Sequence, residues 1–231
     1  MIRMDELRLT LSGAAGPVNV LRGINLAVPA GQTVGLVGPS GSGKTSLLMT
    51  IAGLERPTGG TIAVAGTDLA RLNEDALALF RRQTIGIVFQ NFHLIPTMTA
   101  VENVALPLEL SSAGDAVTRA EAALIAVGLG HRLGHYPAEL SGGEEQRFAV
   151  ARAFVASPRL LLADEPTGNL DRKTGAAVMD LLFDLASALG TTLMLVTHEE
   201  SLASRCERVI RLEDGCLTGD SRLPVMRAVV P

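Results

Sequence analysis

The chain has 231 residues, a formal net charge of −4 and an isoelectric point near 5.6, so it has no excess positive charge for nonspecific binding to nucleic acid. Aromatic residues make up 3% of the chain and tryptophan is absent, which disfavours a platform for stacking bases. No apolar run approaches the roughly 20 residues that a helix needs to cross a bilayer, and the first residues lack the apolar core of a signal peptide. We therefore expect a protein that is kept in the cytoplasm and binds no nucleic acid.

The N-terminal part of the chain predicts a small antiparallel sheet. Apolar and polar residues alternate weakly over 7–11 and again over 18–28, with a loop expected at 13–17. Residues 56–60 have the composition of a turn, and residues 61–65 predict a further strand of the same sheet. This lobe is expected to lie beside a bound nucleotide.

A strand, a glycine-rich turn and a helix are predicted one after another over residues 33–54. Residues 34–37 form a short apolar run that ends at Gly38, as expected of a buried parallel strand. Residues 38–45, GPSGSGKT, match the full pattern G-x-x-x-x-G-K-[ST]. The glycines let successive backbone N–H groups point at phosphate oxygens, and the helix adds the positive end of its dipole. The segment therefore predicts a phosphate-binding loop.

Two side chains of this loop have specific expected roles. Lys44 is predicted to reach the β and γ phosphates, and the Thr45 hydroxyl is predicted to hold Mg²⁺. The alternative is a glycine-rich loop without a ligand, which the strand before it and the helix after it disfavour. The residues predicted to bind nucleotide here are Gly38, Pro39, Ser40, Gly41, Ser42, Gly43, Lys44, Thr45 and Ser46.

The rest of the chain alternates strands with helices. Asn73 is a candidate N-cap for a helix to residue 82, and Gly190 is a candidate C′ residue for a helix over 173–189. Asp214 and Gly215 predict a hairpin turn between strands at 208–212 and 216–218. Further strands are expected at 85–89, 160–163 and 192–196, and further helices at 100–109, 117–127 and 143–156.

This order predicts an α/β fold with a mostly parallel sheet that binds its ligand at the carboxyl edge. We expect one domain over 1–231. Its nucleotide-binding core, with the antiparallel lobe, would comprise 1–90 and 157–220, a helical subdomain would comprise 91–156, and a tail 221–231.

Two adjacent carboxylates follow the predicted leucine-rich strand at 160–163. Packing explains the leucines, but it does not call for Asp164 and Glu165 at the end of the strand. Asp164 is predicted to bind the Mg²⁺ shell through water, and Glu165 to polarise the water that attacks the γ phosphate. A plain surface loop is the alternative, which the phosphate-binding loop elsewhere in the chain disfavours.

A second helix start has the composition of a phosphate site. By capping rules alone, Ser141 is an N-cap and Glu144 completes a capping box. Gly142 and Gly143 are costly at a helix start unless a ligand must approach the backbone. One phosphate-binding loop and one separate phosphate clamp indicate a pair of chains, each clamp closing on the nucleotide of the other.

These residues resemble the nucleotide-binding subunits of ATP-binding cassette (ABC) transporters, whose signature is the LSGGE stretch at 140–144. The likeness covers residues 1 to about 220 and implies a P-loop NTPase fold with a RecA-like core. It further implies that Gln90 is the Q-loop glutamine, which contacts Mg²⁺ and couples the nucleotide to the membrane subunit. Asp171 resembles the D-loop residue that acts across the dimer, and His198 the switch histidine that holds the γ phosphate. Without the resemblance, Gln90 and Asp171 would be read as ordinary polar residues and His198 as a structural histidine.

Two stretches resemble one branch of this superfamily, that of lipoprotein release, macrolide efflux and cell division, with the YbbA-type members the most similar. They are VFQNFHLIPTMTAVENV at 88–104 and DEPTGNLD at 164–171. The resemblance implies a homodimer bound to an integral membrane permease, on the cytoplasmic face of a bacterial inner membrane. The permease is expected to contact the Q-loop and the root of the helical subdomain, near 94–110, although apolar residues there also suit a core.

Two positions depart from the family. Leu11 stands where an aromatic residue usually stacks on adenine, so we expect weak, base-tolerant nucleotide binding. Glu145 stands at a position of the signature where the family more often has Gln. Because it lies beyond the phosphate-facing glycines, we expect ATP hydrolysis to be retained.

The predicted function is an ATP hydrolase that closes around two Mg-ATP and drives a permease that acts on the cell envelope. A regulatory or scaffold module that uses ATP to control an envelope complex has the same ATPase motifs and stays open as the alternative. A soluble ABC protein acting on DNA or ribosomes is disfavoured, because neither a long coiled-coil insertion nor a second cassette is present. A P-loop kinase would leave the second phosphate clamp without a purpose.

Overall fold

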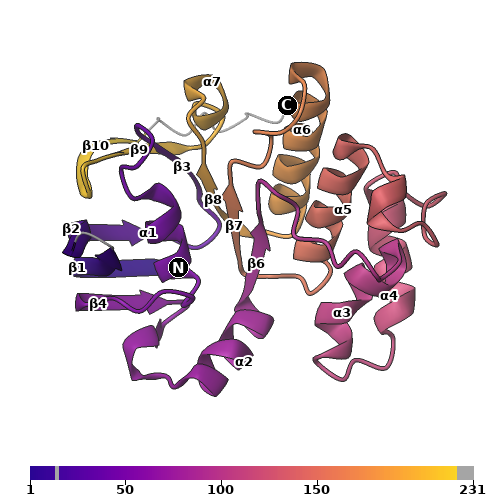
Figure 1. The fold of residues 1–231 in the computed structure, drawn as a ribbon, viewed down its shortest axis with the longest axis horizontal. Coiled ribbons are helices and arrows are strands. Elements are labelled where there is room, and N and C mark those ends of the chain that lie inside the picture. Colours follow the sequence, from indigo (N-terminus) through magenta and orange to yellow (C-terminus); the bar gives the residue numbers. More distant parts are fainter. Residues whose placement is uncertain (14–15, 223–231) are drawn as a thin grey trace, which may run out of the picture. The chain divides into compact units, whose positions relative to one another are not determined.

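The computed structural model describes residues 1–13 and 16–222, which fold as two compact units (Figure 1). Unit 1 combines Met1–Arg71 with the chain from Leu193 onward, and unit 2 is Leu72–Thr192. Residues 14 and 15 of the predicted loop, and residues 223–231 of the predicted tail, lie outside the described residues. The division into a core at 1–90 and 157–220 and a helical subdomain at 91–156 stays a prediction.

An antiparallel sheet lies in unit 1, as the sequence predicts. Its strand order is β2-β1-β4-β5, and residue 61 lies in β4, which pairs with β1. The first strand begins earlier than expected, because a bulge near Glu6, whose φ is +47°, interrupts the alternation that begins at the buried Ile2 and Met4. The strands are β1 (Ile2–Gly13), β2 (Gly16–Val28), β4 (Gly59–Val64) and β5 (Thr67–Asp68).

Unit 1 also contains parallel strands. β3 pairs in parallel with both β8 and β9, and β10 pairs antiparallel with β9. The turn between β9 and β10 confirms the predicted hairpin, since Asp214 and Gly215 have φ of +48° and +74°. The elements are β3 (Thr33–Val37), α1 (Lys44–Ile51), η1 (Leu69–Arg71), β8 (Thr192–Val196), α7 (Glu200–Ala203), β9 (Arg208–Glu213) and β10 (Cys216–Arg222).

Unit 2 contains two parallel strands and most of the helices (Figure 1). The helix starts follow capping rules: the Asn73 side chain accepts from the Ala76 N–H at 2.9 Å, and Thr99 and Glu102 form a capping box. The elements are α2 (Glu74–Thr84), β6 (Ile85–Val88), α3 (Ala100–Glu109), α4 (Ala116–Ala126), η2 (Pro137–Glu139), α5 (Gly142–Phe154), β7 (Leu160–Asp164) and α6 (Arg172–Ala188).

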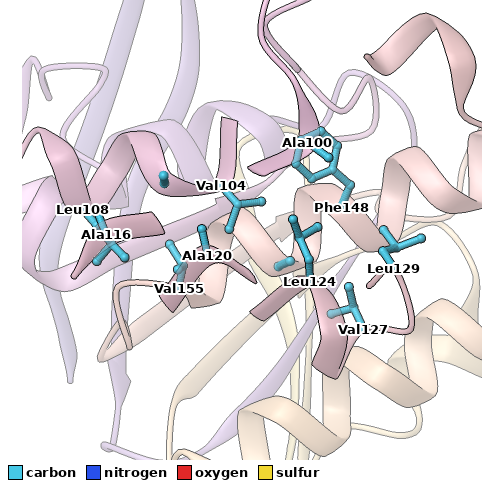
Figure 2. Close-up of a cluster of buried hydrophobic side chains, with 12 residues drawn as sticks. Ala100, Val104, Leu108, Ala116, Ala120, Leu124, Val127, Leu129, Phe148 and Val155 are labelled. Carbon is cyan, nitrogen blue, oxygen red and sulfur yellow. The ribbon is translucent and has the colours of Figure 1, made fainter. Parts of the chain in front are cut away.

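A hydrophobic cluster joins α3, α4 and α5 within unit 2. Figure 2 shows Val104 of α3, Leu124 of α4 and Phe148 of α5 converging, and all three side chains are fully buried. Full burial of side chains of this size stabilises the folded state by roughly 1.5–3 kcal/mol each. The cluster therefore fixes α5, and with it the helix start at Ser141, on a packed frame.

Candidate functional site

The predicted phosphate-binding loop lies between β3 and α1 of unit 1. Packing requires glycine at position 38, since a Cβ added at Gly38 would lie 2.0 Å from the Leu212 carbonyl oxygen. Gly43 has a φ of +100° at the N-cap of α1, a conformation that side chains disfavour. β3 therefore ends in a tight turn that directs the start of α1, as the motif predicts.

Lys44 and Ser42 line this loop. Lys44 is 7% exposed, and its ammonium donates to the carbonyl oxygens of Gly38 and Pro39 at 2.9 and 2.8 Å. The Ser42 side chain is 4% exposed, and its Oγ has no hydrogen-bond partner among the described residues. A buried hydroxyl without a partner is costly unless a ligand pairs with it. The loop therefore fits a group rich in acceptors, such as phosphate.

His198 belongs to the same unit and follows β8. Leu36 of β3 lies opposite Val196 of β8 in the parallel pair, so the loop and His198 leave the sheet at the same edge. The next residue after β8, Thr197, is fixed by its N–H donating to the Leu36 carbonyl at 3.2 Å. The His198 side chain is exposed.

In unit 2, Asp164 and Glu165 stand at the carboxyl end of β7. Glu165 has a φ of +43°, an uncommon conformation for a residue with a side chain, and its carbonyl accepts from the Gly168 N–H at 3.0 Å. Such strained backbone is characteristic of functional sites. The turn from Glu165 to Gly168 therefore fixes the direction in which the carboxylate leaves the strand.

Gln90 follows β6, at the same edge of the sheet as Asp164, because Val88 and Ala163 are partners in the parallel pair of β6 and β7. Asn169 holds Gln90 from one side: its Nδ2 donates to the Gln90 carbonyl at 3.0 Å, and the Gln90 Nε2 donates to the Asn169 Oδ1 at 3.4 Å. No pattern in the sequence indicates this contact of Asn169 with Gln90, although Asn169 lies within the stretch DEPTGNLD at 164–171.

The capping box at the start of α5 is present. The Ser141 N–H and hydroxyl both donate to Glu144 Oε2, at 2.9 and 2.8 Å, and the Arg132 Nε donates to Glu144 Oε1 at 2.9 Å. The hydrogen bonds from Ser141, with that from Arg132, hold the pKa of Glu144 at about 2. Glu144 is therefore a fixed anion that stabilises the helix start.

The two glycines of this helix start differ. A Cβ added at Gly143 would lie 2.4 Å from Thr174 Cγ2, so packing against α6 already requires glycine there. At Gly142 an added Cβ would make only an ordinary contact, 3.5 Å from Leu170 Cδ2. A ligand is thus not needed to explain Gly143, whereas Gly142 leaves room for one.

Asp171 caps α6. Its carboxylate accepts from the backbone N–H groups of Lys173 and Thr174 at 3.0 and 3.1 Å. The hydrogen bonds from Thr174 and Lys173 lower the pKa of Asp171. This structural role accounts for the residue type without excluding a second role in contacting a partner.

Two features are absent from the part of the chain that the structure describes. No group of three or more His, Cys, Asp and Glu side chains is placed to hold a metal ion by itself. No helix in those residues has the length and apolar character that crossing a membrane requires.

Comparison with known proteins gives matches over most of the chain. The family model described as ABC transporter matches residues 21–168. The lipoprotein-releasing system ATP-binding protein LolD of Geobacter metallireducens is 52% identical over 221 residues, covering 94% of this chain and 98% of the relative. The uncharacterized ABC transporter ATP-binding protein YbbA of Escherichia coli is 47% identical over 219 residues, covering 94% and 96%. A dimeric post-hydrolysis state of the ATP-binding cassette MJ0796 bound to ADP and Pi matches with a TM-score of 0.90 and 38% identity, covering 97% of this chain and 99% of that one.

Proposed function

Because this chain belongs to the ABC transporter family, as an ATP-binding and ATP-hydrolysing subunit, we propose that it works as a homodimer that drives a membrane permease acting on the cell envelope. The single observation that carries the proposal is the phosphate-binding loop, with Lys44 at its mouth and a buried Ser42 hydroxyl lacking a partner among the described residues. The structurally similar ATP-binding cassette MJ0796, solved with ADP and Pi bound, supports ATP as the nucleotide.

We assign the phosphate contacts to residues 38–46. Lys44 binds the β and γ phosphates, and the N–H groups at the start of α1 bind phosphate oxygens. Thr45, Gln90 and Asp164 would hold Mg²⁺, which would supply positive charge to offset that of the phosphates. Hydroxyl, amide and carboxylate oxygens are the donors that Mg²⁺ prefers, which supports this set.

The hydrolytic roles belong to Glu165 and His198. Glu165 accepts the proton of the attacking water, and His198 holds the γ phosphate. The new bond joins the water oxygen to the γ phosphorus, and the bond from that phosphorus to the bridging oxygen of ADP breaks. The strained backbone at Glu165, with a φ of +43°, supports a functional role for this residue.

The second clamp acts across the dimer. Ser141, Gly142 and Gly143 bind the γ phosphate on the partner subunit, and Asp171 contacts that subunit. The absence of a close contact at Gly142, where an added Cβ would lie 3.5 Å from Leu170 Cδ2, and the dimeric state of the solved relative support this arrangement. ATP closes the pair and hydrolysis reopens it.

An apolar groove of unit 2 is the proposed contact with the permease. The predicted docking region 94–110 divides between two environments: Val104 and Leu108 are buried in the helical cluster, whereas Leu106 and Leu110 line the groove. Leu79 and Leu110 are 48% and 61% exposed, and a permease segment bound in the groove would remove this apolar surface from water. The residues that line the groove are Asp75, Ala78, Leu79, Arg82, Leu106, Pro107, Leu110 and Arg152.

The relatives support an envelope role. The name of the Geobacter relative assigns it to a lipoprotein-releasing system, so we propose extraction or export of envelope components as the process that this subunit drives. The subunit would sit peripherally on the cytoplasmic face of the inner membrane. The second candidate function, an ATP-switched regulatory module, requires the same ATPase residues. The two functions are therefore distinguished by identifying what the dimer binds.

Affinity purification tests the permease proposal. Tagged Glu165→Gln protein, held with Mg-ATP in detergent extracts of native membranes, is expected to retain a stoichiometric polytopic membrane protein, identified by mass spectrometry. The double variant Leu79→Asp/Leu110→Asp places charges in the groove and is expected to lose that protein while still binding ATP. Recovery of the dimer alone, or with soluble proteins only, would favour the regulatory function instead.

Base recognition is predicted to be weak. Residues 1–71 and 193–231 contain no Phe, Tyr or Trp, and Leu11 pairs with Val18 across β1 and β2. We expect Leu11→Tyr to strengthen ATP binding by about 1–3 kcal/mol, as gained by stacking a base on an aromatic ring. Titration of ATP and GTP by calorimetry measures this gain.

The matched control is Ser12→Tyr, which adds the same ring at the next, exposed position, on the opposite face of the strand. It is expected to leave both dissociation constants unchanged. Equally tight ATP binding by the wild type and Leu11→Tyr would show that Leu11 does not limit affinity.

A further inference from the structure

The turn that carries Gln90 is held in an unusual backbone conformation. Phe92 and His93 are consecutive non-glycine residues with φ of +56° and +49°, in the left-handed region that side chains disfavour. The Phe92 N–H donates to the Phe89 carbonyl at 3.4 Å, so residues 89–92 close as a turn around Gln90. Such a conformation persists only where surrounding contacts impose it.

Arg152 of α5 supplies those contacts. Its Nη1 donates to the His93 carbonyl at 2.6 Å and its Nη2 donates to the Phe92 carbonyl at 2.7 Å. Both acceptors belong to the two left-handed residues. The Arg152 side chain is half-buried, and this burial lowers its pKa. Hydrogen bonds from a charged donor in such surroundings are stronger than those between neutral groups.

Gln90 is therefore held from two sides within unit 2. Asn169 bonds to its carbonyl and approaches its side chain, while Arg152 fixes the carbonyls two and three residues later. A Cβ added at Gly168 would lie 2.7 Å from Gln90 Nε2, so a residue larger than glycine at 168 would collide with the Gln90 amide in this position. Loss of the Arg152 contacts would release the turn while leaving the contacts with Asn169.

We propose that Arg152 is a positioning residue for Gln90, which imposes the left-handed turn at Phe92 and His93 and so presents the Gln90 side chain to Mg²⁺. The inference rests on the proposed function, in which Gln90 is a Mg²⁺ ligand. Arg152 itself contacts neither nucleotide nor metal in this assignment. Because it also lines the groove, a permease segment bound there would touch the residue that holds the turn.

The test is the affinity of the ATP-bound protein for Mn²⁺ used in place of Mg²⁺, measured by electron paramagnetic resonance, together with the Mg²⁺ dependence of ATP hydrolysis at saturating ATP. Arg152→Met keeps an unbranched side chain but removes both donors, and we expect the Mg²⁺ concentration for half-maximal rate to rise about tenfold, as for loss of a charged hydrogen bond. The KM for ATP should change less than about twofold, since Arg152 makes no contact with the phosphate-binding loop. Arg119→Met is the matched control: Arg119 also donates to a backbone carbonyl of unit 2, that of Val155, at 3.0 Å, and its loss should leave the Mg²⁺ requirement unchanged.

Additivity separates positioning from a general structural effect. The double variant Gln90→Ala/Arg152→Met should need no more Mg²⁺ than Gln90→Ala alone, because Arg152 acts only through Gln90. Independent, additive effects would overturn the inference. An unchanged Mg²⁺ requirement in Gln90→Ala would overturn it too, whereas absence of hydrolysis by the wild type would contradict the proposed function itself.

A second pair of variants tests the turn without changing Arg152, so its result does not depend on whether the Arg152→Met protein folds. His93→Val and His93→Gly both remove the imidazole, whose ring centroid lies 4.7 Å from that of Phe89. Only valine opposes the left-handed backbone. His93→Val should therefore reproduce the raised Mg²⁺ requirement and His93→Gly should not; equal values for the two would contradict a role for the turn conformation.

Discussion

Glu165→Gln is expected to lower the rate of ATP hydrolysis by about 100- to 10,000-fold, the range lost when a general base is removed. The amide has nearly the same shape as the carboxylate, so the turn that the Gly168 N–H closes on the Glu165 carbonyl at 3.0 Å should be retained. What is lost is the ability to accept the proton of the attacking water. ATP then remains bound in both sites, and the closed dimer should accumulate.

Two measurements check this expectation. Single-turnover assays with labelled ATP give the chemical rate, and size-exclusion chromatography with Mg-ATP gives the fraction of dimer. Glu207→Gln is the control, since Glu207 is an exposed carboxylate outside the site, and it should hydrolyse ATP as the wild type does. Appreciable turnover in Glu165→Gln would remove this residue from the role of base.

Motifs with local spacing could be predicted from the sequence in detail. The phosphate-binding loop depends on glycines within eight residues, and the structure gives Gly43 the φ of +100° that the motif requires. The hairpin at Asp214 and Gly215 was predictable for the same reason, since both residues tolerate the left-handed backbone. In each case the physical cause lies in adjacent residues.

Contacts between distant residues could not be predicted. Gln90 and Asn169 are 79 positions apart, and no periodicity relates them. The requirement for glycine at Gly143 arises from Thr174 on another helix, so the sequence indicated a ligand where packing is a sufficient cause. Arg152 was counted only as part of a helix, because its two acceptors are carbonyls that carry no signal in the sequence.

Short elements were missed for a different reason. β5 has two residues and α7 has four, about one period of the strand and helix patterns respectively, and one period is too short for a repeat to be recognised. α7 nevertheless determines a core position, since a Cβ added at Gly35 of β3 would lie 3.0 Å from the Ala203 Cβ. Gly35 lies in the strand that leads to the phosphate-binding loop, so a short helix after His198 restricts which residues that strand can carry.

Lys44→Ala is expected to weaken ATP binding by at least about 3 kcal/mol, or more than about 100-fold, because two or more charged hydrogen bonds to phosphate are lost. Lys44 is 7% exposed and its ammonium donates to the carbonyls of Gly38 and Pro39, so less side-chain freedom is left to be lost when phosphate binds. Fluorescence titration with a labelled ATP analogue measures the loss, and nucleotide-driven dimerisation should disappear with it.

The chain offers a natural control, since Lys173 is its only other lysine and is exposed on α6. Lys173→Ala makes the same change in charge and should retain ATP binding. This result would show that Lys44 acts by direct contact with phosphate and not through the net charge of the protein. Lys44→Arg should not restore binding, because the larger planar guanidinium does not fit a loop where Nζ lies 2.8 Å from the Pro39 carbonyl oxygen. Full affinity in Lys44→Arg would mean that charge alone, and not the compact shape of the ammonium, determines phosphate binding at this loop.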